Sequence, residues 1–124
     1  MKFSSGKKRQ RLSDAELEKR LGRERLEALS LARFGGVMIS DDVYSGRCVV
    51  DYMFREEPNE GPPFSGWTFF SSESGEDAAA GVELRDCLAL LRVAPEVAEY
   101  LDMPPGTVLV RTGEATFAKE EDED

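Results

Sequence analysis

The chain of 124 residues contains no histidine, and this absence removes much of the chemistry that enzymes use. Histidine is the side chain that titrates nearest to neutral pH, so its absence excludes Ser-His-Asp and Cys-His nucleophiles and His-ligated zinc. Cys48 and Cys87 are the only cysteines, too few to hold a structural zinc ion by themselves. Both lie in otherwise apolar segments, and we expect them to be buried, reduced thiols.

Long apolar runs are also missing. No stretch approaches the roughly 20 apolar residues of a membrane-spanning helix. Residues 1–12 are basic and lack the apolar centre of a secretory signal, so we expect a cytoplasmic protein. A glycine-rich phosphate loop is absent, and Asp41-Asp42 lacks the spacing of a calcium loop. The sequence therefore predicts no cofactor, no bound metal and no membrane partner.

The charge is negative overall and unevenly placed. The net charge is −9, while residues 1–12 carry five bases and no acid. Residues 36–112 hold fourteen acids, five Arg and no Lys. Nucleic acid is a poor partner for such a surface, because binding to phosphates depends on cations. A basic protein is a better one, since complementary fields speed encounter. The alternative is that the acidic surface only keeps the protein soluble.

The chain divides into four segments. Residues 1–12 read as a disordered basic arm, and residues 119–124 as a mobile acidic tail. Ser13 and Glu16 fit a capping box that begins a helix over residues 13–34. Its apolar face would pack on the domain or on a second copy of the chain, which leaves a homodimer open. Residues 35–118 would form a single α+β domain.

Within this domain, short apolar runs alternate with turn residues. The pattern predicts strands over residues 37–40, 47–54, 67–72 and 107–112, a turn or a single helical turn over 41–46, and helices over 84–93 and 95–101. Ala115 to Ala118 would extend or pair with the last strand. The predicted fold is a small, mostly antiparallel sheet with helices packed against it.

A dense aromatic block occupies the middle of the chain. Six of the eleven Trp, Tyr and Phe residues lie between Tyr52 and Phe70, beside Arg55 and several carboxylates. The block reads as a hairpin with a long Pro/Gly loop. By alternation, Trp67 and Phe69 face one side of the sheet, and Thr68 and Phe70 face the other. One side should form the core, and the other is either covered or presented to a partner.

This block supplies the candidate partner-binding residues. Aromatic residues and Arg dominate protein interfaces, and carboxylates would steer a basic partner. The candidates are Asp51, Arg55, Glu56, Glu57, Glu60, Phe64, Trp67 and Glu73. Two alternatives remain: a solvated hairpin end in which Arg55 pairs with a neighbouring carboxylate, or a carboxylate-based hydrolase. Adjacent strand residues point to opposite faces, which argues against joint catalysis by Glu56 and Glu57.

The same block resembles a bacterial family first catalogued as a domain of unknown function and later classed as immunity-protein family thirty-three (Imm33). The resemblance rests on Val43, Gly46, residues 52–58, residues 65–71, residues 88–95, Tyr100-Leu101-Asp102 and Pro105-Gly106-Thr107. It covers about residues 36–112, the acidic stretch. Members are encoded in polymorphic toxin systems and are proposed to neutralise a partner toxin.

The resemblance implies a non-enzymatic binding protein whose partner is a cognate toxin domain. The charge of residues 36–112 suggests that this partner is at least partly basic. The alternative is a cytoplasmic adaptor or regulatory domain that binds a peptide or a small molecule between hairpin and helices. In both cases we expect stoichiometric binding and no turnover.

Overall fold

The fold combines short helices with one sheet, which confirms the predicted α+β class. The computed structural model describes residues 11–57, 64–71 and 81–120. The elements in chain order are α1 (Asp14–Leu21), α2 (Arg23–Ala28), β1 (Gly36–Ile39), α3 (Asp41–Tyr44), β2 (Tyr52–Arg55), β3 (Phe64–Phe70), β4 (Glu83–Arg85), α4 (Cys87–Val93), the 3-10 helix η2 (Pro95–Tyr100), β5 (Val108–Arg111) and β6 (Phe117–Lys119).

The six strands form one sheet in the order β4-β1-β3-β2-β5-β6. Strand β1 runs parallel to β3, and every other neighbouring pair is antiparallel. The predicted pairing of β2 with β3 is confirmed, with Tyr52 opposite Phe70 and Arg55 opposite Trp67. The sheet is therefore mostly antiparallel, as predicted.

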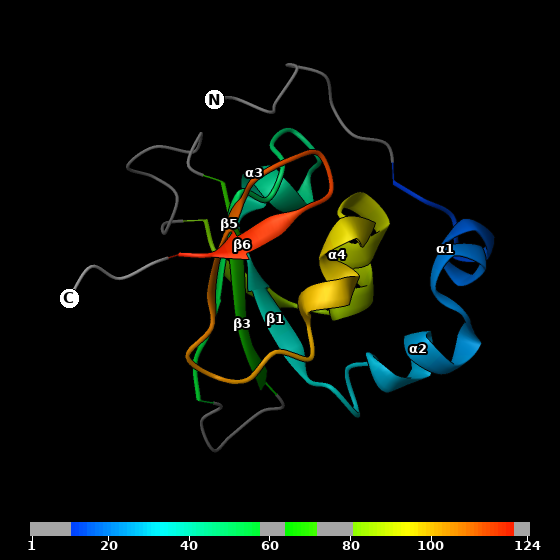
Figure 1. Cartoon of the computed structure of the whole chain (residues 1–124). Helices are drawn as coiled ribbons and strands as arrows, with labels where there is room; N and C mark the ends of the chain where they lie inside the picture. The colour runs from blue at the N-terminus through cyan, green and yellow to red at the C-terminus, as the bar shows by residue number, and fades with distance from the viewer. Residues whose placement is uncertain (1–10, 58–63, 72–80, 121–124) are drawn as a thin grey trace.

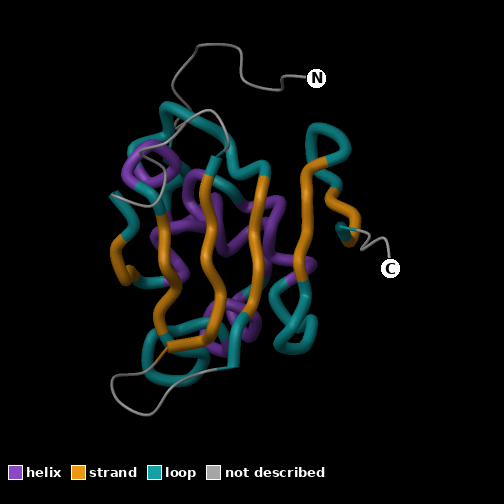
Figure 2. The backbone as a smooth tube through the Cα atoms, turned by 90° about the vertical axis from the view of Figure 1, so that its left-hand side faces the viewer, coloured by secondary structure: helices purple, strands orange, loops and turns teal. Residues whose placement is uncertain are grey.

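The helices gather on one side of the sheet. Figure 1 shows α4 beside the sheet, with α1 and α2 farther out on the same side. Figure 2, turned by 90°, shows the strands in front and these helices behind them. No described helix covers the side of the sheet that faces the viewer in Figure 2.

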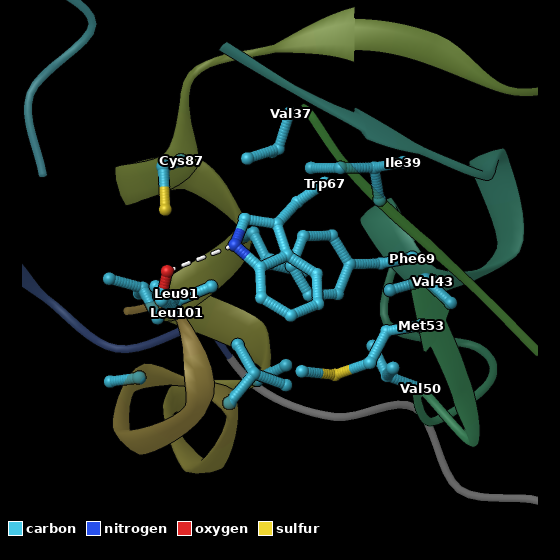
Figure 3. Close-up of a cluster of buried hydrophobic side chains, with 14 of the residues drawn as sticks. Val37, Ile39, Val43, Val50, Met53, Trp67, Phe69, Cys87, Leu91 and Leu101 are labelled. Carbon is cyan, nitrogen blue, oxygen red and sulfur yellow. Dashed lines mark hydrogen bonds between the residues drawn. The ribbon is translucent and has the colours of Figure 1, made fainter. Parts of the chain in front are cut away.

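The core fills the space between the sheet and α4. Its largest fully buried side chains are Trp67 and Phe69, which stack with ring centroids 5.7 Å apart. The Trp67 Nε1–H donates a hydrogen bond of 3.0 Å to the carbonyl oxygen of Leu101, the dashed line in Figure 3. Leu91 and Cys87 of α4 complete this side (Figure 3).

The single helix predicted over residues 13–34 is wrong. Gly22 adopts φ +89°, a left-handed conformation that ends α1, and α2 stops at Ala28. The predicted capping box is present, and the hydrogen bond from the Ser13 N–H lowers the pKa of the Glu16 carboxyl. Leu17 and Leu29 are buried, so the first and the second half of the segment 13–34 both pack on the domain.

The helix predicted over residues 84–93 begins later. The Asp86 side chain accepts a hydrogen bond from the Leu88 N–H and caps α4, so Leu84 and Arg85 are left to pair with β1 as strand β4. The strand predicted over 47–54 is shorter, since β2 begins at Tyr52 and ends at Arg55. The helix predicted over 95–101 is a 3-10 helix. Within the described residues, no helix has the length and apolarity needed to span a membrane.

Candidate functional site

Trp67, a predicted partner-binding residue, lies in the core. Its exposed fraction is 0%, and it packs between Phe69 and the η2–β5 connection. The prediction that one side of the alternating block forms the core is confirmed, and Trp67 is on that side. It therefore supports the surface from within and offers no area to a partner.

Arg55 is also turned toward the helix side of the sheet. Its Nε–H donates to the Ser65 carbonyl at 2.9 Å, and Nη1 donates to the carbonyls of Met103 (2.7 Å) and Leu101 (3.4 Å). Its guanidinium lies between the rings of Phe34 and Trp67. Among the described residues, the acceptors of this cation are carbonyl oxygens and not the neighbouring carboxylate that the sequence suggested. Arg55 clamps the η2–β5 connection to the hairpin.

The predicted acidic residues do not form one cluster. Glu56 and Glu57 are exposed just beyond β2, whereas Asp51 is half-buried just before it. Five residues of extended chain separate Asp51 from Glu56 by about 16 Å. Glu60 and Glu73 lie outside the described residues, and Phe64 is half-buried at the start of β3. Among the described residues, no group of three or more acids or cysteines is placed to hold a metal ion.

The position of Glu56 is fixed by Gly66. The Glu56 N–H donates to the Gly66 carbonyl at 2.8 Å, which continues the β2–β3 ladder past Arg55. Gly66 has φ +97°, and a Cβ there would lie 2.1 Å from the carbonyl oxygen of Glu56. Only glycine fits this approach. The hairpin therefore carries Glu56 at a defined place at the end of the sheet.

The side of the sheet opposite the helices, which we call the open face, carries the residues that alternate with the core. Apart from the irregular Gly36–Phe64 pairing, the registers place nine residues on it: Met38, Tyr52, Phe54, Thr68, Phe70, Leu84, Val108, Val110 and Ala118. All except Thr68 are partly or fully accessible, and Leu84 is 46% exposed. The expectation that Phe70 faces away from Trp67 is confirmed.

Three rings form the centre of the open face. The Tyr52 and Phe70 centroids are 5.0 Å apart, and Phe54 lies 6.2 Å from each of them in edge-to-face geometry. Such contacts hold large side chains in place at little entropic cost. No charged side chain falls among the nine positions. Chemically, this surface is suited to binding an apolar surface of another molecule.

Sequence reasoning missed a buried ion pair. The Arg111 Nη2 lies 2.7 Å from Glu96 Oε2, and the two side chains are only 1% and 7% exposed. Arg111 also donates to the carbonyls of Val50 (2.6 Å) and Glu114 (2.6 Å). Arg111 lies two residues after Leu109, which faces the core, so alternation along β5 could have indicated that Arg111 also faces the core. The pair ties β5 to η2 and to the segment before β2.

A pocket of about 650 Å³ lies between α1, η2 and the β5–β6 turn. Its walls include Leu21, Arg20, Glu99 and Glu114. The pocket adjoins the β5–β6 turn, whereas the alternative ligand site was expected between the hairpin and the helices.

The two thiols differ in accessibility. Cys87 is fully buried, and burial together with the Asp86 charge raises its pKa to about 12, while Cys48 is half-buried. Because the thiolate is the reactive form, Ellman's reagent at pH 8 should label Cys48 in the folded protein and Cys87 only after unfolding. The Cys48→Ala variant should show no labelling before unfolding. Equal labelling rates for the two thiols in native protein would contradict this prediction.

Comparison with known proteins adds a family match to this geometry. The family model described as Immunity protein Imm33 domain matches residues 37–121. The match begins within β1 and includes every later strand and α4, whereas α1 and α2 lie before it. No curated protein and no solved structure shows a match.

Proposed function

The chain belongs to the Imm33 immunity protein family, and from this premise we propose that it neutralises a cognate bacterial toxin by binding it stoichiometrically. The observation that carries the proposal is the match over residues 37–121, which includes all of the sheet except the first residue of β1. The protein acts without turnover, in the cytoplasm, by covering the active site or the substrate groove of the toxin.

Electrostatics supports a partner that is at least partly basic. Each of the five arginines between residues 36 and 112 donates to a carboxylate or a carbonyl oxygen of this chain; they are Arg47, Arg55, Arg85, Arg92 and Arg111. Glu56 and Glu57 remain exposed, and their side chains make no ion pair within the described residues. Exposed carboxylates steer a basic toxin toward the domain. Glu60 and Glu73, although outside the described residues, belong to the same proposal.

The 650 Å³ pocket supports a second candidate function, an adaptor or regulatory domain of the same family that binds a peptide or small molecule. Mixed charges and an apolar wall formed by Leu21 and Val93 would suit an amphipathic ligand. The two candidate functions can be distinguished, because only a toxin partner requires a protein encoded near this chain.

Co-expression tests the proposed function directly. The product of the open reading frame adjacent to this one in the source genome should arrest growth when it is expressed alone. Co-expression of this chain should restore growth, and the two purified proteins should form a complex of fixed stoichiometry. Growth arrest that persists at equal expression of a folded chain, without a complex, would reject the immunity role.

Charge reversal tests the steering role. Glu56→Lys combined with Glu57→Lys should lower the association rate constant with the toxin by about tenfold at low salt, because the local field changes sign. The difference should shrink at high ionic strength, which screens exposed charges. Stopped-flow association at several salt concentrations measures both effects.

Glu24→Lys with Glu27→Lys is the matched control. These two exposed glutamates lie on α2, outside the family match, and their reversal changes the net charge by the same amount. If both double variants slowed association to a similar extent, the association rate would depend on the net charge and not on the position of Glu56 and Glu57.

A further inference from the structure

We propose that the open face is the surface on which the toxin docks, with a basic edge of the toxin placed at the end of the sheet that carries Glu56, Glu57 and Glu120. This inference rests on the proposed function and adds to it the binding surface, the chemistry of the partner and its orientation. The toxin surface that fits is apolar at its centre and carries Lys or Arg along one side.

The apolar centre follows from the composition of the open face. A sheet face that met only water would carry polar side chains in alternation with the core. Here the central strands instead carry Tyr52, Phe54 and Phe70, flanked by Val108 and Val110. These residues are neither fully buried nor fully exposed, as expected of rings that pack against each other and present one edge outward. Aromatic clusters of this kind are the usual anchors of protein interfaces.

Leu84 extends the apolar surface to the edge of the sheet. It lies opposite Met38 in the ladder, and its side chain covers Gly36, where an added Cβ would lie 2.8 Å from Leu84 Cδ1. Leu84 and Leu31 are the two most exposed large apolar residues that the structure describes, each at 46%. Leu31 lies in the segment after α2, outside the family match.

Glu56, Glu57 and Glu120 lie at one end of the sheet, whereas the exposed Glu83 at the other end is paired with Arg85 at 3.6 Å. Phe54 of β2 pairs with Val108 of β5, and the chain continues past β2 toward the first end with Glu56 and Glu57. The Glu120 N–H donates to the Val108 carbonyl at 2.9 Å, which brings Glu120 to the same end. By alternation Glu56 and Glu120 follow Phe54 and Ala118 on the open face, while Lys119 falls on the other side of β6. The asymmetry of charge fixes the orientation of a basic partner.

The open face is large enough for the centre of an interface. Six strands about 4.8 Å apart and about four residues long give a projected area of roughly 300 Å². Stable complexes bury about 800 Å² on each partner, with an apolar centre and a polar rim. The acidic end and the shallow hollow formed by Pro104, Thr107 and Glu120 supply part of that rim.

The test uses the full chain and the toxin encoded beside it, inactivated in its active site. Leu84→Lys and Phe54→Ala should each raise the dissociation constant at least about tenfold, mainly through faster dissociation, because they act at the packed centre. Leu31→Lys makes the identical substitution at an equally exposed leucine and should leave the affinity unchanged. Circular dichroism should show that all three variants are folded.

The outcomes separate this inference from the proposed function. If the wild-type chain neither binds the toxin nor rescues growth, the immunity role fails and the docking surface fails with it. If the wild-type chain binds and Leu84→Lys and Phe54→Ala bind as tightly as Leu31→Lys, the immunity role stands and the open face is wrong. The orientation is tested by pairing Glu120→Lys with Lys→Glu changes on the toxin, and restored affinity in one such pair supports it.

Discussion

Replacing Arg111 with Met should lower the free energy of unfolding by about 3–5 kcal/mol, the cost of removing one partner from a buried ion pair. The guanidinium is 1% exposed and satisfies the Glu96 carboxylate together with the carbonyls of Val50 and Glu114. Its removal leaves a buried charge and unpaired carbonyl oxygens. Urea unfolding followed by the fluorescence of the single buried Trp67 measures the loss.

Two further variants make this result interpretable. Arg47→Ala breaks the ion pair with Asp42, but the Arg47 side chain is 60% exposed, so its loss should cost less than about 1 kcal/mol. Glu96→Gln in the Arg111→Met background should recover part of the stability, because the buried charge is then gone. A loss for Arg111→Met as small as that for Arg47→Ala would contradict the assigned role.

Trp67→Ala should cost a similar amount, about 3–5 kcal/mol, through the cavity left in a packed core. It also removes the hydrogen bond to the Leu101 carbonyl and one of the rings beside Arg55. Because the only tryptophan is lost, thermal and urea unfolding should be followed by circular dichroism.

Phe54→Ala is the matched control on the other side of the same hairpin. Phe54 is half-exposed, so its truncation should lower the free energy of unfolding clearly less than the truncation of Trp67. Relative to this loss of stability, Phe54→Ala should weaken the proposed toxin complex more than Trp67→Ala does. If Trp67→Ala left stability unchanged and reduced toxin affinity, Trp67 would be a contact residue, and its placement in the core would be wrong.

Local pattern was enough to predict much of the hairpin. The alternation of apolar residues through Phe69 and Phe70 correctly separated a core side from a second side, because side chains along a strand face opposite ways. The capping box likewise needed only residues three apart, and it is present. Such signals depend on neighbours in sequence and can be read without the fold.

Features that depend on distant residues were not predictable in the same way. Leu84 and Arg85 are strand because β1 pairs with them, a contact some 46 residues away in sequence. The same alternation that sorted the rings did not reveal that Arg55 would find carbonyl acceptors at residues 101–103, or that Arg111 would find Glu96. In both cases the partner is supplied by a loop or helix whose position only the folded sheet determines.

The place of β1 in the sheet has a consequence for synthesis. Strand β1 lies between β3 and β4, and both neighbours follow it in the chain. As the polypeptide leaves the ribosome, β1 has no strand to pair with until β3, up to about residue 70, has emerged, and no second neighbour until about residue 85, a delay of seconds at 5–20 residues per second. A newly made chain must therefore keep this apolar strand from aggregating until both of its neighbours have been synthesised.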